Sequence, residues 1–206
     1  MRLPPSTSAP RLGDRLAHYR AVPRTLPAVA CSMVMGATLL TAGCTGGTPE
    51  AFAALSVAYP GFPDVASLNR IIGDFMFWAP SLRIAQAHAK HAPTYFYRYD
   101  FSPKTLDLLG YGATHASELM AVFGVYHGTT GWVLGALGDR RIAMRVSDGM
   151  QRDWITFART GRPAGEWPTY NGTSRATLVI DDRNRIVYDP SPEIRRAWDA
   201  FEAARR

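Results

Sequence analysis

Apolar residues recur at helical spacing in two segments that follow residue 48. The first, "TPEAFAALSVAYP", has Thr48 at the N-cap position and Pro60 at its end, which predicts a short helix between them. The second, "GDFMFWAPSLRIAQAHAKHAP", predicts a helix with Asp74 as its N-cap and Pro80 in its first turns. The predicted buried face of this second helix comprises Phe77, Leu82, Ile84 and Ala85.

Segments rich in β-formers alternate with further helical patterns toward the C-terminus. "TYFYRYDF" (94–101) is bounded by prolines and predicts a strand, and "ATLVID" and "RIVYDP" predict two more strands around a polar turn. A long helix is predicted over about residues 143–160, ended by "TGRP", and a last helix from about Ser191 with Pro192 at its N1 position. The predicted core of the long helix comprises Met144, Met150, Trp154, Ile155 and Phe157. This alternation predicts an α/β protein.

The first 47 residues differ in kind from residues 48–206. Arginines precede the apolar run "TLPAVACSMVMGATLLTAGC", an order typical of secretory signals. "LTAGC" resembles a bacterial lipobox, which would place a lipid on Cys44 and hold the protein at a membrane surface. The expected location is then secreted or cell-envelope. The alternative is a leader without a targeting role, and then a cytoplasmic protein.

Composition and charge exclude several classes of function. A hydrophobic content of 47% in 206 residues fits a globular protein with a real core. The net charge of +6 is scattered and forms no long basic run, so no nucleic-acid partner is expected. Both cysteines lie in the first 44 residues and the five histidines form no zinc-binding pattern, so we expect neither a metal site nor a cofactor.

One histidine stands in a loop context that suits chemistry. In "GYGATHASELMAVFG" (110–124), His115 follows small residues and precedes Glu118 by three positions. Gly110, Gly112 and Ala113 would let the loop turn tightly and bring the imidazole close to a partner. An imidazole beside a serine can take its proton and make it nucleophilic. A lone loop histidine is, however, more often merely exposed, and the residues alone leave both readings open.

The histidine loop is one of four motifs that follow one another along most of the chain. They are "IIGDFMFWAP", "TYFYRYDF", "GATHASELMAVFG" and "MQRDWITFARTGRPAGEWPTY". From about residue 48 onward, the chain resembles the C-terminal third of the type-B carboxylesterases, the family of cholinesterases and bacterial para-nitrobenzyl esterases. The resemblance implies an incomplete α/β-hydrolase, namely the C-terminal strands and helices of a doubly wound sheet. It also implies that His115 is the general base of a Ser-Glu/Asp-His triad, and that Glu118 supports its loop.

The same resemblance makes clear what these 206 residues do not contain. There is no G-x-S-x-G nucleophile elbow and no glycine-rich oxyanion loop before His115. "GTSRA" (172–176) follows the histidine and predicts a polar turn. Asp74 is interpreted as a helix cap, and Asp64 and Asp100 as loop or strand-end residues, so none is assigned as the triad acid. The chain alone is expected to be inactive.

Three hypotheses about function remain open. The first is a fragment of a carboxylic ester hydrolase, from a truncated, split or misread gene, whose partner polypeptide would complete a site for a small ester substrate. The second is a non-catalytic, exported or lipid-anchored module that binds hydrophobic ligands or another polypeptide, and the third is a remnant that never folds. An acyl pocket could be lined by Met120, Phe123, Val125 and Trp132, although ordinary core packing is the simpler explanation of these side chains.

Overall fold

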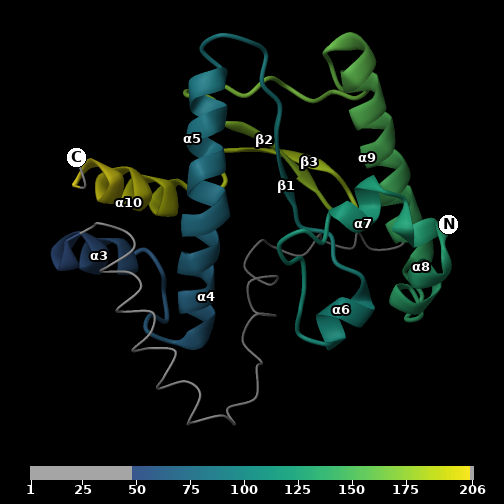
Figure 1. Cartoon of the computed structure of the whole chain (residues 1–206), viewed down its shortest axis with the longest axis horizontal. Coiled ribbons are helices and arrows are strands. Elements are labelled where there is room, and N and C mark those ends of the chain that lie inside the picture. The colour runs from purple at the N-terminus through teal and green to yellow at the C-terminus, as the bar shows by residue number, and fades with distance from the viewer. Residues whose placement is uncertain (1–47, 205–206) are drawn as a thin grey trace, which may run out of the picture.

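The computed structural model describes residues 48–204, which form helices packed on both faces of a small sheet (Figure 1). The elements preceding the histidine loop are the helices α3 (Pro49–Ser56), α4 (Val65–Gly73), the π-helical turn η2 (Asp74–Trp78), α5 (Ala79–His88), the strand β1 (Phe96–Tyr99) and α6 (Lys104–Leu108). Those that follow it are α7 (Leu119–Val122), the 3₁₀ turn η3 (Val125–His127), α8 (Thr129–Leu134), α9 (Arg140–Thr160), β2 (Ala176–Ile180), β3 (Arg185–Tyr188) and α10 (Pro192–Ala203).

The sheet has the order β1-β2-β3 and mixes two kinds of pairing. β1 pairs parallel with β2, from Phe96 opposite Thr177 to Tyr99 opposite Ile180, and β2 pairs antiparallel with β3. Every residue of the central strand β2 is buried, as expected of a strand that is covered on both faces. Among the described residues, β1 has no strand on its other side.

Two larger hydrophobic clusters hold the helices in place. In one, α9 packs on the sheet through Met150 and Val146, which meet Leu178 and Ile180 of β2. The other lies outside the sheet and joins α3 and α4 to Trp198 and Phe201 of α10, with other members from the turn η2. A smaller cluster joins Leu82 and Ala85 of α5 to Tyr170, and Phe96 of β1 packs against it. Helices α5 and α9 thus lie on opposite sides of the sheet (Figure 1).

Most of the predicted elements are confirmed, and their caps explain why. Thr48 Oγ1 accepts a hydrogen bond from Ala51 N at 3.2 Å, which caps α3 as predicted. The strands β1, β2 and β3 lie within the predicted segments. Helix α9 ends at Gly161, whose φ of 74° is left-handed, and α10 begins with a proline in its first turn.

The start predicted for the second helix is wrong. The helix begins at Val65, where the Asp64 carboxylate accepts a hydrogen bond from Ser67 N at 2.7 Å, so Asp64 is an N-cap and not a loop or strand-end residue. Asp74 lies inside the helix, at the first residue of its π-helical turn. The carboxylate of Asp74 instead accepts a hydrogen bond from the Tyr59 hydroxyl at 2.7 Å.

Part of the predicted core is also wrong. Leu82, Ala85 and Met150 are buried as predicted, whereas Phe77 and Ile84 of the second helix are exposed. Ile155 and Phe157 of α9 are likewise about half exposed. Periodicity defines an apolar stripe along a helix but not how much of that stripe a neighbouring element covers.

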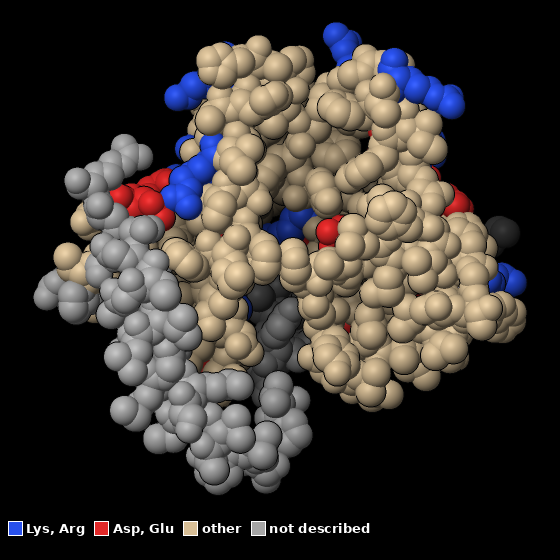
Figure 2. Space-filling model, viewed as in Figure 1, with Lys and Arg blue, Asp and Glu red and all other residues tan. Residues whose placement is uncertain are grey.

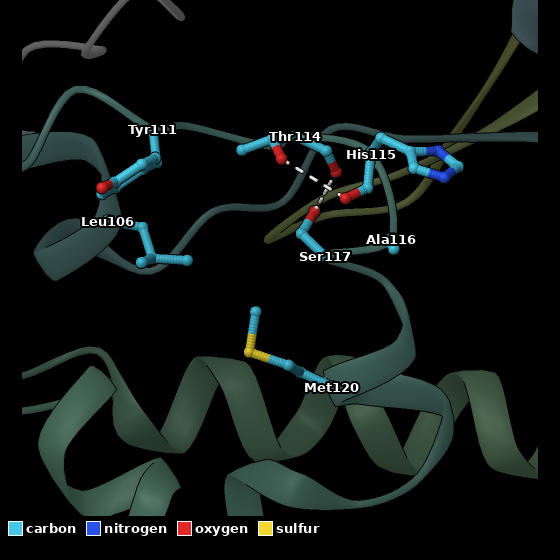
Figure 3. Close-up of a pocket in the computed structure, with 7 residues that line it drawn as sticks. All are labelled: Leu106, Tyr111, Thr114, His115, Ala116, Ser117 and Met120. Carbon is cyan, nitrogen blue, oxygen red and sulfur yellow. Dashed lines mark hydrogen bonds between the residues drawn. The ribbon is translucent and has the colours of Figure 1, made fainter.

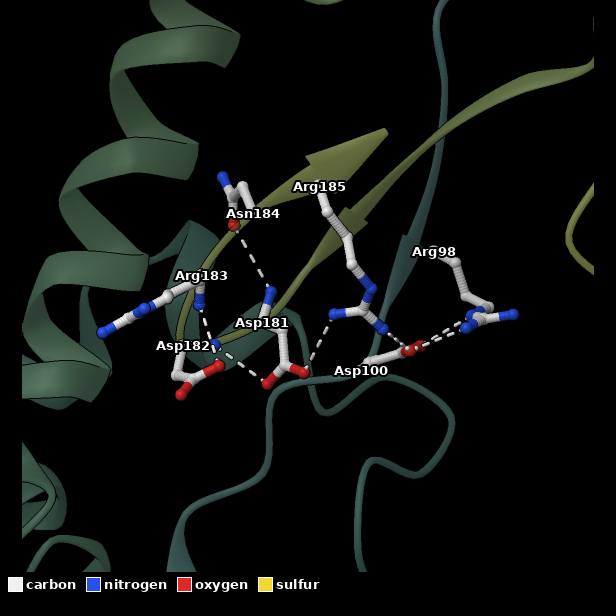
Figure 4. A network of polar contacts seen from close by, with 7 residues as sticks. All are labelled: Arg98, Asp100, Asp181, Asp182, Arg183, Asn184 and Arg185. Carbon is white, nitrogen blue, oxygen red and sulfur yellow. Dashed lines mark hydrogen bonds and ion pairs between the residues drawn. The ribbon is translucent and has the colours of Figure 1, made fainter. Parts of the chain in front are cut away.

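Charged side chains hold the C-terminal ends of β1 and β2 together (Figure 4). The Arg98 guanidinium donates two hydrogen bonds of 2.7 Å to the Asp100 carboxylate, a bidentate geometry. Arg185 of β3 reaches the same carboxylate at 3.5 Å and the Asp181 carboxylate at 3.3 Å. Asp100 is thus a strand-end residue, as predicted, and its ion pairs fix the point at which the chain leaves the sheet toward α6 and the histidine loop.

Candidate functional site

The loop that carries His115 is built from left-handed turns and short hydrogen bonds. Gly110 and Gly112 have φ values of 79° and 60°, which glycine adopts without strain, so both residues allow the tight turn that was predicted. Tyr111 N donates to Leu106 O at 2.9 Å, which returns the chain toward α6. The Ser117 hydroxyl donates to Thr114 O at 2.7 Å and closes the turn around the histidine.

Ala116, directly after the histidine, also has a left-handed backbone, with φ of 65°. An alanine in this region is strained, and such strain persists only where the surrounding structure enforces it. The sequence pointed instead to Ala113, which does not have a positive φ. No sequence signal marks Ala116, because nothing in its side chain favours that conformation.

The His115 side chain is exposed at the surface of the described part of the chain. Its imidazole stacks on the phenyl ring of Phe77, with ring centroids 3.8 Å apart and planes inclined by 13°. Within residues 48–204, neither ring nitrogen has a hydrogen bond or an ion pair. The arrangement therefore presents a histidine whose nitrogens are available to a partner group.

Glu118 lies at the base of the loop, where α7 begins. Its backbone carbonyl accepts hydrogen bonds from Ala121 N and Val122 N, both at 2.9 Å, and its side chain is half-buried. Burial raises the pKa values of Tyr97 and Tyr99 in β1, and the nearby negative charge of Glu118 raises them further. The carboxylate of Glu118 is thus close enough to β1 to act on both tyrosines, and within residues 48–204 no hydrogen bond or ion pair joins it to His115.

A cavity of about 320 Å³ lies next to the loop (Figure 3). Its lining residues are Leu106, Tyr111, Thr114, His115, Ala116, Ser117 and Met120. The imidazole of His115 points away from Leu106, Tyr111 and Met120, so the ring does not enter the cavity (Figure 3). The cavity is therefore formed on the reverse side of the histidine loop.

The four residues proposed for an acyl pocket are not brought together around His115. Met120 lines the cavity and also packs against the hydrophobic cluster between α9 and the sheet. Phe123 ends α7 and is exposed, and Val125 is half-buried in η3. Trp132 of α8 is exposed, with the Arg140 guanidinium 4.8 Å from its ring centroid. Of these four residues, only Met120 lines the cavity next to the histidine loop.

The remaining predicted features fall outside this site. "GTSRA" forms a polar turn, as predicted, in which the Asn171 side-chain oxygen accepts hydrogen bonds from Thr173 N at 2.9 Å and Ser174 N at 2.7 Å. No group of three or more potential metal ligands occurs within residues 48–204. None of the helices in this range has the length and apolar character needed to cross a membrane. Cys44 and the leader 1–47 lie outside the described residues.

Sequence and structure comparisons agree with this architecture. The model of the "Carboxylesterase family" matches residues 64–196. The chain is 36% identical over 126 residues to para-nitrobenzyl esterase of Bacillus subtilis, an alignment that covers 60% of this chain and 25% of that protein. It is 31% identical over 125 residues to phenmedipham hydrolase of Pseudarthrobacter oxydans, covering 58% of this chain and 25% of that protein. A solved para-nitrobenzyl esterase superposes with a TM-score of 0.62 at 27% identity, over 87% of this chain and 35% of the other.

These similarities define part of an α/β-hydrolase of the esterase class. The chain belongs to the carboxylesterase family, in its type-B branch. It spans about a quarter of the length of the curated relatives just described.

Proposed function

We propose that this chain supplies the general-base histidine, His115, to a carboxylic ester hydrolase. The observation that carries the proposal is the histidine loop itself, whose left-handed turns present an imidazole with no hydrogen-bond partner among the described residues. Membership of the carboxylesterase family supports this role for a histidine in this sequence context. In the reaction, His115 accepts the proton of a serine hydroxyl as that oxygen attacks the ester carbonyl, and later returns a proton to the leaving alcohol.

The serine and the triad acid belong to polypeptide other than these 206 residues, which contain no nucleophile elbow. A general base contributes roughly 10²- to 10⁴-fold to a rate, and the oxyanion donors contribute a separate and comparable factor. The chain on its own therefore lacks the groups that form and stabilise the acyl intermediate. Glu118 supports the loop from beneath and is not the triad acid.

A direct test uses nitrobenzyl and short-chain nitrophenyl esters, the former suggested by the name of the Bacillus subtilis relative. The purified chain should show no turnover and no covalent labelling by a serine-reactive phosphonate. Adding the part of that relative that precedes the region of similarity should restore both. Labelling of the chain alone would contradict the proposal that its serines are not nucleophiles.

Substitution of the histidine then tests its role within the completed enzyme. We expect His115→Ala to lower kcat roughly 10²- to 10⁴-fold, the usual contribution of a general base. His127→Ala is the matched control, because His127 is also exposed but its Nε2 lies 2.9 Å from the Asp148 carboxylate. Equal activities of the two variants would overturn the assignment of His115 as the base.

The alternative function is a non-catalytic, exported or lipid-anchored module that binds hydrophobic ligands. The largely apolar cavity behind the histidine loop favours it, since a small apolar ligand could lie against Leu106 and Met120 without contacting the imidazole. Mass spectrometry of the protein in the cell-envelope fraction tests the anchor. A lipid-modified Cys44 terminus would support it, and an unprocessed Met1 terminus would exclude it.

A further inference from the structure

The helix that runs from Val65 to His88 is interrupted by one π-helical turn. At this turn, Ala79 N donates to Asp74 O, five residues back, in place of the usual four. Pro80 follows and has no N–H to donate, so an α-helical hydrogen bond to the carbonyl of Met76 cannot form there. The extra residue of the turn shifts the side chains that precede it relative to those of α5, and single π-turns of this kind often occur at functional sites.

Two side chains at the start of the π-turn are fixed against the hydrophobic cluster that joins α3 and α4 to α10. The Asp74 carboxylate accepts the hydrogen bond of the Tyr59 hydroxyl at 2.7 Å. Phe75 stacks on Trp198 of α10, with ring centroids 6.0 Å apart and planes inclined by 29°. These contacts fix the rotation of the turn about the helix axis.

Phe77, two residues further on, makes a different contact. It remains 40% exposed, and its ring lies face to face with the imidazole of His115, 38 positions later in the sequence. A phenyl ring in this position covers one imidazole face and leaves both nitrogens at the ring edge uncovered. The face of a phenyl ring also attracts a cation within about 6 Å of its centroid, which includes the imidazolium formed when His115 takes up a proton.

We propose that Phe77 is a positioning residue for His115, held in place by the π-helical turn. The stacked ring restricts the imidazole to one orientation, and the left-handed backbone of Ala116 fixes the loop directly after the histidine. This inference rests on the proposed role of His115 as a general base. It adds that the base depends on an aromatic side chain from a helix before β1.

The orientation can be measured in the full chain by NMR, without any activity. We expect nuclear Overhauser contacts between the ring protons of Phe77 and His115, and an upfield ring-current shift of the His115 ring protons. Phe77→Leu keeps an apolar side chain but removes the ring, so the His115 signals should move to those of an exposed histidine such as His91. Phe77→Tyr should preserve the shift.

Ile84→Leu provides the matched control, because Ile84 is an exposed apolar residue of α5, the helix that follows directly after the π-helical turn. If Phe77→Leu changes the His115 signals no more than Ile84→Leu does, the proposed stacking is wrong. Unchanged backbone spectra elsewhere would show that the variants remain folded.

Kinetics of the enzyme completed with the preceding part of the Bacillus subtilis relative provide the second measurement. Phe77→Leu should lower kcat by about 10- to 100-fold, the size of effect expected from a misplaced catalytic group, with little change in KM. Phe77→Tyr should retain most of the wild-type kcat, because it keeps an aromatic ring at this position. A loss confined to KM would overturn the positioning role, whereas a stacked His115 in a protein that never hydrolyses esters would refute only the proposed function.

Discussion

At the scale of single residues, the hydroxyl group of the buried Tyr59 links three segments that are distant in sequence. The Trp198 indole donates to the Tyr59 hydroxyl at 2.6 Å, and this hydroxyl donates in turn to Asp74 at 2.7 Å. Burial raises the pKa of Asp74, although the hydrogen bond from Tyr59 and the charge of Arg70 act in the opposite direction. Burial and the charge of Asp74 also raise the pKa of Tyr59, so its hydroxyl stays protonated and remains a donor.

The raised pKa of Asp74 predicts how stability depends on pH. The unfolded carboxyl loses its proton near its ordinary value of 3.8, whereas the folded one keeps it to a higher pH. Within that window the folded state binds more protons, so this group's contribution to stability falls as pH rises. Asp74→Asn keeps an oxygen that can accept from Tyr59 but does not titrate.

Unfolding by urea, followed by tryptophan fluorescence, measures this effect. We expect the stability of the wild-type chain relative to Asp74→Asn to be greater at pH 4 than at pH 8. Other carboxyl groups are common to both proteins, so their contributions cancel in the difference. A difference that grows in favour of the wild type as pH rises would mean that Asp74 is stabilised in its charged form.

At the scale of elements, a glycine inside helix α9 and the glycine that caps it test opposite effects of the same substitution. Gly161 ends the helix with a φ of 74°, and Gly149 lies within the helix. A Cβ at either position would meet no atom within 4 Å, so steric contact does not distinguish them. The backbone conformation alone should decide the sign of the effect.

Gly161→Ala should lower the free energy of unfolding by roughly 1 kcal/mol, because an alanine is strained in the left-handed region. Gly149→Ala should raise it by roughly 0.5 to 1 kcal/mol, because alanine loses less backbone freedom in a helix. Chemical denaturation of the two variants beside the wild type measures both. Stabilisation by Gly161→Ala would contradict the left-handed cap.

Elements with local signals were predictable from the sequence, and those shaped by distant contacts were not. Thr48, "TGRP" and Pro192 mark helix ends through caps and turn residues that act on their immediate neighbours. Asp74 resembles a cap equally well, yet Tyr59 and Trp198 hold it inside a helix. The short elements α6, α7 and α8 lack strong periodicity and were not predicted.

The candidate site likewise combines features that local sequence signals predict with features that depend on distant contacts. His115, Gly110 and Gly112 could be identified from the order of small residues around one histidine. The contact with Phe77 could not, because it depends on the phase of a helix after a π-helical turn that no residue pattern announces. An apolar residue in a helical stripe predicts core packing, and at Phe77 that prediction failed because the ring meets a loop at the surface.

At the scale of the whole molecule, the described part of the chain leaves much apolar surface uncovered. One face has few charged side chains, and it is hollowed between α5 and α9 over the sheet (Figure 2). Large hydrophobic residues are exposed on several helices, among them Met76, Ile84, Leu108 and Trp132. The strand β1 adds an edge that is unpaired within residues 48–204. Exposed apolar patches and open strand edges both favour association with other chains.

We therefore expect the isolated chain to self-associate, and the apolar surface of α5 to contribute. Sedimentation velocity over a range of protein concentrations should show growing species in the wild type. Ile84→Glu should reduce them, because it places a charge on a side chain that is 70% exposed. Ser81→Glu adds the same charge at another exposed position of α5, so it separates loss of apolar surface from a change in net charge. If the two variants reduce association equally, charge alone is responsible. If only Ile84→Glu does so, this face of α5 is a contact surface that a partner polypeptide would have to cover.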